Sequence, residues 1–179
     1  GINRANDYIS LISQRKDSEC GGAERKAQFI GEAKALRAVF YMNLVAFWGE
    51  VPLRITPTYD LKTQNLKKAS QQEIYAQIIS DLEYAGENCL PANKFETPGR
   101  ISQTAAWALH AIAAKALERD TGARALRAIL EEYMLDIMYE IPKDDSIGEV
   151  VITREYIEGN GGPKILLRGQ EPILLEGSH

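Results

Sequence analysis

The side chains most often used for metal binding and nucleophilic catalysis are scarce in this chain. Its 179 residues include two cysteines, Cys20 and Cys89, and two histidines, His110 and His179. Neither cysteine has a second cysteine or a histidine close to it in the sequence, so their spacing fits neither a zinc site nor a disulfide framework. We therefore expect two free thiols, no metal site and no catalytic residues of the histidine or cysteine type.

The chain also lacks a sequence pattern for holding the phosphates of a nucleotide. A loop of the form GxxxxGK[ST] occurs nowhere, and no acidic residue follows a predicted strand where it could hold Mg²⁺. Such a Gly-rich loop with its lysine is what cradles nucleotide phosphates. The sequence therefore predicts that the chain neither binds nor hydrolyses ATP, uses no cofactor and is not an enzyme.

Aromatic side chains could serve a different chemistry, the stacking of sugar rings. The candidates are Phe40, Tyr41, Trp48, Tyr59 and Trp107. Those that fall in predicted helices lie within apolar stripes, which favours core packing over sugar stacking. We therefore predict no glycan-binding residue.

Charge and hydropathy exclude two classes of partner. The formal net charge is -4, and lysines and arginines are interspersed with acidic residues, so no basic surface for nucleic acid or anionic lipid is expected. No apolar run approaches the roughly 18 residues of a membrane helix. The start, GINRANDYIS, does not resemble a secretory signal. We expect no nucleic-acid or membrane partner, and a soluble cytoplasmic protein on recombinant expression.

Apolar periodicity predicts the elements that would position these residues. Five helices are expected, over 2–14, 24–47, from Ser70 to the late 80s, 102–119 and 123–140. Ser70 and Glu73 form a capping box, and the stretch VPLRITPTYDLKTQNLKKA before it is predicted to be a long loop. Near the end, EVVIT and KILLR are β-prone and flank REYIEGNGGP, which predicts two short strands joined by a turn.

The first two thirds of the chain resemble a known family. The ordered segments INRANDYI, GEAKALRAVFYMNLVAFWGEVPL, ASQQEIYAQIISDLEYA and GRISQTAAWAL, from Ile2 to about Ala114, are similar to the SusD/RagB family of outer-membrane lipoproteins, which bind glycans beside a transporter. The resemblance implies antiparallel helical hairpins of tetratricopeptide type, with the loop after GEVPL wrapped around them. Members of that family have several hundred residues, so most of the glycan-binding half is not expected here.

The last third resembles an unrelated family. AIAAKALERDTGARALRAILEEYMLDIMYEIP and VVITREYIEGNGGPKILL, within 112–168, are similar to the C-terminal small domain of the cytoplasmic AAA+ unfoldase ClpX. The resemblance implies that Arg124 of TGAR is a sensor-2 arginine, which contacts the terminal phosphate of a bound nucleotide. Without a large ATPase domain, we interpret Arg124 as inactive.

The two resemblances meet inside one predicted helix, at a junction within 105–118, with no Gly-, Ser- or Pro-rich linker. We therefore predict an engineered chimera without evolved catalytic activity, composed of a SusD/RagB-like segment 1–111, a ClpX-like segment 112–171 and a cloning remnant with a partial His tag at 172–179. The alternative is a helical-repeat binding or adaptor module that keeps remnants of glycan uptake or of ATP-dependent unfolding.

The predicted fold class is mainly α within α+β, with stacked antiparallel helical hairpins followed by a small β element of two short strands. An isolated pair of strands leaves its outer amides and carbonyls open to a partner strand. We therefore expect possible self-association through this strand edge, whereas ATP and glycan are not expected partners.

Overall fold

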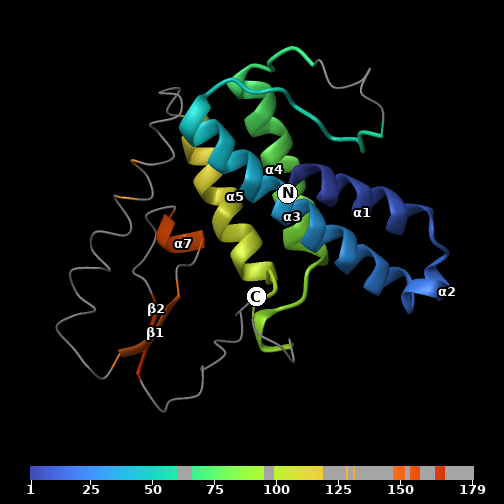
Figure 1. Ribbon diagram of the computed structural model, residues 1–179. Helices are drawn as coiled ribbons and strands as arrows, with labels where there is room; N and C mark the ends of the chain where they lie inside the picture. The colour runs from blue at the N-terminus through green and yellow to red at the C-terminus, as the bar shows by residue number, and fades with distance from the viewer. Residues whose placement is uncertain are drawn as a thin grey trace.

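The structure is a computed structural model in which residues 1–59, 66–94, 99–118, 128, 131, 147–151, 154–157 and 164–167 are described. The chain is mainly helical (Figure 1). The helices are α1 (Ile2–Gln14), α2 (Asp17–Cys20), α3 (Ala23–Trp48), α4 (Gln71–Asn88), the 3-10 turn η2 (Ala92–Lys94), α5 (Gln103–Glu118) and α7 (Arg154–Ile157); the strands are β1 (Ile147–Val151) and β2 (Lys164–Leu167).

Local sequence signals set the boundaries of the long helices. The Ser70 hydroxyl accepts a hydrogen bond from the Glu73 amide at 3.2 Å, and the Glu73 carboxylate accepts one from the Ser70 amide at 2.8 Å. These two bonds confirm the predicted capping box at the start of α4. At the end of α3, Gly49 has φ +68 and donates its amide to the Val45 carbonyl at 2.9 Å, a backbone conformation that favours glycine. The short α2 falls in a stretch for which we predicted no helix.

The core lies between α3, α4 and α5. Helix α3 packs against α1 on one side and α4 on the other, and α4 packs against α5, which runs in the opposite direction (Figure 1). The largest fully buried apolar side chains are Tyr41 and Val45 of α3 with Ile74, Ile78 and Leu82 of α4. Helix α3 therefore has neighbours on two sides, which accounts for its broad apolar surface.

Small residues bring α4 and α5 close together. Gly86 is buried in α4, and a Cβ atom placed on it would lie only 2.4 Å from Cε2 of Trp107 on α5. Fully buried alanines at positions 106 and 113 line the same helix. The small side chains of α5 therefore permit the close approach of α4 and α5.

The two strands pair antiparallel, with Val150 opposite Ile165 and Val151 opposite Lys164, and the register is irregular between Ile147 and Glu149. No third strand joins them among the residues that the structure describes. Helix α7 lies between them in sequence and packs against α5. The predicted fifth helix at 123–140 lies almost wholly outside the described residues, as does the segment 172–179.

Candidate functional site

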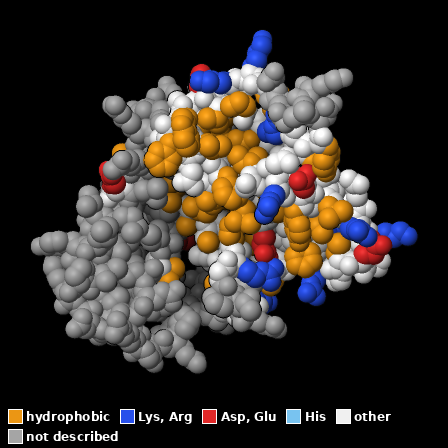
Figure 2. Space-filling view, in the orientation of Figure 1, with side chains coloured by type: hydrophobic (Ala, Val, Ile, Leu, Met, Phe, Trp, Pro, Cys, Tyr) orange, Lys and Arg blue, Asp and Glu red, His pale blue; other side chains and the backbone are white. Residues whose placement is uncertain are grey.

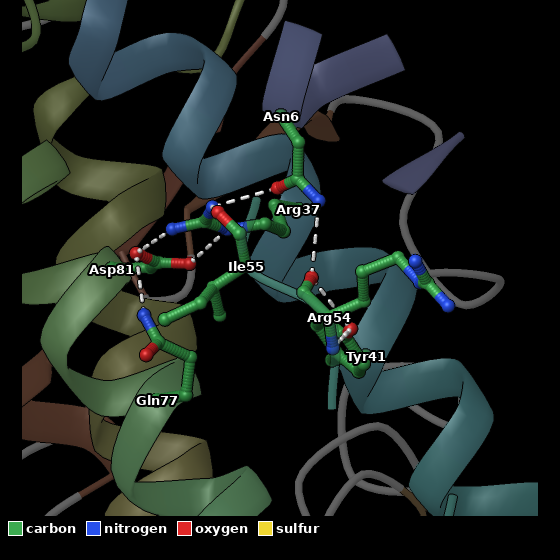
Figure 3. Close-up of polar contacts among 7 residues, drawn as sticks. All are labelled: Asn6, Arg37, Tyr41, Arg54, Ile55, Gln77 and Asp81. Atoms are coloured by element: carbon green, nitrogen blue, oxygen red, sulfur yellow. Dashed lines mark hydrogen bonds and ion pairs between the residues drawn. The ribbon is translucent and has the colours of Figure 1, made fainter. Parts of the chain in front are cut away.

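The most connected polar cluster is buried where α1, α3 and α4 meet the loop after Gly49 (Figure 3). Arg37 of α3 is at its centre: Nε and Nη2 donate to Oδ2 and Oδ1 of Asp81, each at 2.8 Å, and Nη1 donates to Oδ1 of Asn6 at 2.8 Å. Gln77, one turn before Asp81 on α4, donates a further hydrogen bond to it at 3.0 Å. The side chains of Asn6, Arg37 and Asp81 are almost completely shielded from solvent.

This cluster holds the loop against the helices, and we call it the loop anchor; its residues are Asn6, Arg37, Tyr41, Gln77 and Asp81. The Asn6 amide donates to the carbonyls of Arg54 and Thr56, both at 3.1 Å, and Arg37 Nη1 donates to the carbonyl of Ile55 at 3.1 Å. Tyr41 adds a reciprocal pair, because its hydroxyl donates to the Arg54 carbonyl at 2.9 Å and accepts from the Arg54 amide at 2.6 Å. Three consecutive loop carbonyls are therefore satisfied by helix side chains.

The geometry explains why an ion pair can be buried here. Removing two charges from water is costly, and only a well-formed pair with additional hydrogen bonds compensates for it. The Arg37–Asp81 contact is bidentate, the strongest arrangement of this pair, and Asn6, Gln77 and Ile55 occupy further donors and acceptors. The hydrogen-bonding groups of the pair are thus used within the protein, so the cluster positions the loop and is not a reactive centre.

Sequence reasoning missed both members of this pair. A signal was present, because Arg37 stands between Leu36 and Ala38 in a helix that is apolar around most of its circumference. Asp81 likewise falls between Ile78 and Leu82 in the buried stripe of α4. A charge at such a position requires a partner of opposite sign, so two such residues on neighbouring helices predict one another.

Of the candidate aromatic side chains, Tyr41 is buried as predicted, whereas Trp48 and Phe40 are not. Tyr41 is 1% exposed, and burial raises the pKa of its hydroxyl, while Trp107 is partly buried and meets the ring of His110 edge-on at 5.4 Å. Trp48 and Phe40, however, are 67% and 39% exposed. A residue of an apolar stripe is buried only where another element covers it. The Trp48 ring is largely uncovered, and the Phe40 ring is covered in part, by Gly1 at the start of α1.

Trp48 has an exposed aromatic neighbour. Phe47 is 74% exposed, and the two rings meet at the end of α3 in an edge-on arrangement with centroids 5.7 Å apart. Tyr59, in the loop, is 83% exposed. Exposed aromatic rings of this kind can stack on the apolar faces of ligands.

The two cysteines are free and lie in different environments. Cys89 is 4% exposed; burial above all, with the nearby Glu32 carboxylate, raises the pKa of its thiol to about 11. Cys20 is partly exposed at the end of α2. A thiol with a raised pKa is a poor nucleophile at neutral pH, so Cys89 is a packing residue.

Two kinds of feature are absent from the described part of the chain. No three histidine, cysteine, aspartate or glutamate side chains gather there into a possible metal site. Within the same residues, no helix combines the length and apolar composition needed to cross a membrane. Arg124, the residue predicted to be sensor-2-like, and His179 lie outside the described residues.

Two family models match the sequence. Residues 1–115 match the SusD-like family described as starch-binding and associating with the outer membrane. Residues 103–152 match the family of the C-terminal, D2-small domain of ClpB protein. The two matches overlap at 103–115, which lies entirely within α5.

Curated relatives of the chain are ClpX proteins. The ATP-binding subunit ClpX of Borrelia duttonii is 42% identical over 72 residues, which is 40% of this chain and 15% of that protein. ClpX 2 of Wolinella succinogenes is 44% identical over 196 aligned residues, which cover 92% of this chain and 47% of that protein. The chain therefore spans less than half the length of these relatives.

Solved structures similar to this one are SusD-like. A laminarin-binding SusD-like protein superposes with a TM-score of 0.56 at 28% identity, over 73% of this chain and 27% of that one. A SusD-like protein from Bacteroides fragilis gives the same TM-score and identity, over 66% of this chain and 22% of that one. The chain thus combines a SusD-like helical segment with a segment similar to the small domain of ClpX.

Proposed function

The chain belongs to the SusD-like family over residues 1–115, and on this premise we propose that it is a non-catalytic helical scaffold produced by deliberate recombination of SusD-like and ClpX-like fragments. The observation that carries the proposal is the single helix α5, which both family models share. A natural fusion of two domains more often has a flexible linker at the boundary.

The packing of α5 supports this origin. Its buried residues Ala106, Ile112 and Ala116 belong to one core cluster with α3 and α4, so the helix is built into the SusD-like part over its length. Small and aliphatic side chains provide similar ridges in any helical hairpin, which permits fragments of unrelated origin to share one. Searching 1–110 and 115–170 separately against genomes tests the recombination, because natural proteins that contain both segments in this order would contradict it.

The non-catalytic part of the proposal is tested with ATP. The sequence has the arginine of TGAR but no phosphate loop, and one guanidinium cannot position nucleotide, Mg²⁺ and water together. We expect isothermal titration calorimetry of the whole chain with Mg-ATP to give no saturable heat, and phosphate release to stay at background. Micromolar ATP binding that is lost in Arg124→Ala would overturn the proposal and establish a sensor role.

A second candidate function, favoured by the exposed pair Phe47 and Trp48, is binding of an oligosaccharide. The similar structures include a laminarin-binding protein and one described with a xylogluco-oligosaccharide, and exposed aromatic rings are suited to stacking on sugars. Isothermal titration calorimetry with laminarin oligosaccharides tests this function. Saturable binding lost in Trp48→Ala but kept in the control Trp107→Phe would support it, and no saturable change would count against it.

A further inference from the structure

A hollow of about 710 Å³ lies between α1 and α3. Its apolar lining comes from both helices and consists of Ala5, Tyr8, Phe29, Ala33, Leu36 and Phe40. Leu36, Tyr8 and Phe40 are 48%, 42% and 39% exposed, so the hollow is open to solvent. In Figure 2, hydrophobic side chains over α1 and α3 are interspersed with Lys and Arg and with Asp and Glu. A largely apolar hollow with few polar groups is the usual form of a ligand site, and this volume falls in the range of about 300–1,000 Å³ for such sites.

The charges at the hollow are not balanced. Its acidic side chain, Glu32, is already paired, because its carboxylate accepts from Nη2 and Nε of Arg100 at 2.5 and 3.0 Å, and its basic side chain is Arg4. Arg4 is exposed and makes no hydrogen bond or ion pair with any other residue that the structure describes. Tyr8 stands one turn after Arg4 on α1, and burial, with the nearby Glu32 carboxylate, raises the pKa of its hydroxyl, which therefore stays protonated.

We propose that this hollow binds one amphiphilic anion, an alkyl chain of medium length that ends in a carboxylate. Arg4 is the basic side chain that pairs with the carboxylate, and Tyr8, one turn after Arg4 on α1, offers its hydroxyl as a second donor. The rings of Phe29 and Phe40 and the side chain of Leu36 cover the alkyl chain and remove it from water. This site is independent of the glycan and nucleotide functions considered above.

Isothermal titration calorimetry with decanoate below its micelle concentration tests the proposal on the whole chain. We expect one saturable site, with at least about tenfold weaker affinity in Arg4→Gln because the paired cation is lost. Lys67→Gln, which removes an exposed cation that does not line the hollow, should bind as the unchanged protein does. Leu36→Gln should weaken binding by removing apolar contact, and far-UV circular dichroism shows that each variant keeps its helices.

Several results would overturn the proposal. Equal affinity for decyltrimethylammonium would show that the charge of Arg4 does not select the ligand, as would unchanged affinity in Arg4→Gln. Absence of saturable binding would show that no site exists. Binding to anionic vesicles without binding to free decanoate would assign the hollow to a membrane surface. A dimer that Leu36→Gln converts to monomer in sedimentation experiments would assign it to a second copy of the chain.

Discussion

At the scale of single residues, the buried pair Arg37–Asp81 holds more of the structure together than any exposed charge. Arg37→Met leaves the Asp81 carboxylate buried without its cation and removes the donor to the Ile55 carbonyl. We expect the free energy of unfolding to fall by about 3–5 kcal/mol, measured by urea denaturation. Arg100→Met, which breaks the more exposed pair with Glu32, should cost about 1 kcal/mol or less. Similar losses in the two variants would contradict the assigned role of the buried pair.

The two thiols should differ in reactivity with a disulfide reagent at pH 8. Cys20 should react in the folded protein, whereas Cys89, which is buried and has a pKa of about 11, should react only as the protein unfolds.

The unfolded thiol loses its proton near its ordinary pKa of 9.0, before the folded one does, so the contribution of Cys89 to stability should decline between pH 9 and 11. The Cys89→Ala variant should not show this loss of stability between pH 9 and 11. Rapid labelling of both thiols in the folded protein would contradict the predicted difference in reactivity.

At the scale of elements, local sequence signals determine the helix boundaries, but they do not determine which side chains of a helix are exposed to solvent. The expected helices at 2–14 and 24–47 and the capping box at Ser70 correspond closely to the structure, because apolar period and caps act over a few residues. Trp48 could not be placed from the sequence, since its burial depends on whether a distant segment covers the end of α3. The loop anchor was missed for a related reason, because the ion pair joins residues 44 positions apart.

The contact between α4 and α5 gives a prediction at this scale. Gly86→Ala improves helix propensity by up to about 1 kcal/mol in isolation, but here the new Cβ would collide with the indole ring of Trp107. We expect a net loss of about 1–3 kcal/mol in thermal or urea unfolding because of overpacking. Combining the change with Trp107→Leu should recover part of the loss, and a stabilised Gly86→Ala single variant would show that the helices can move apart freely.

At the scale of the whole molecule, the described residues include a helical core and a short strand pair that differ in how their backbone groups are satisfied. Both strands of the pair are edges among the described residues, and we propose that one edge pairs with a second copy of the chain. Analytical ultracentrifugation should show association that increases with concentration and weakens in Leu166→Pro, because proline removes a backbone donor from β2. A monomer at all concentrations, or association unchanged by the proline, would contradict the proposal.

The last prediction concerns independence of the helical core. The core cluster formed by α3, α4 and α5 contains buried residues from Ala35 to Ala116, all of them within residues 1–118. Because hydrophobic burial is the main favourable term in folding, residues 1–118 alone should fold, with a cooperative urea transition and the loop anchor intact. The urea midpoint of residues 1–118 should lie close to that of the whole chain, and Arg37→Met should destabilise the two proteins to the same extent. If 1–118 is unfolded or lacks a cooperative transition, the ClpX-like segment is part of the folding unit, and α5 requires that segment to pack against α4.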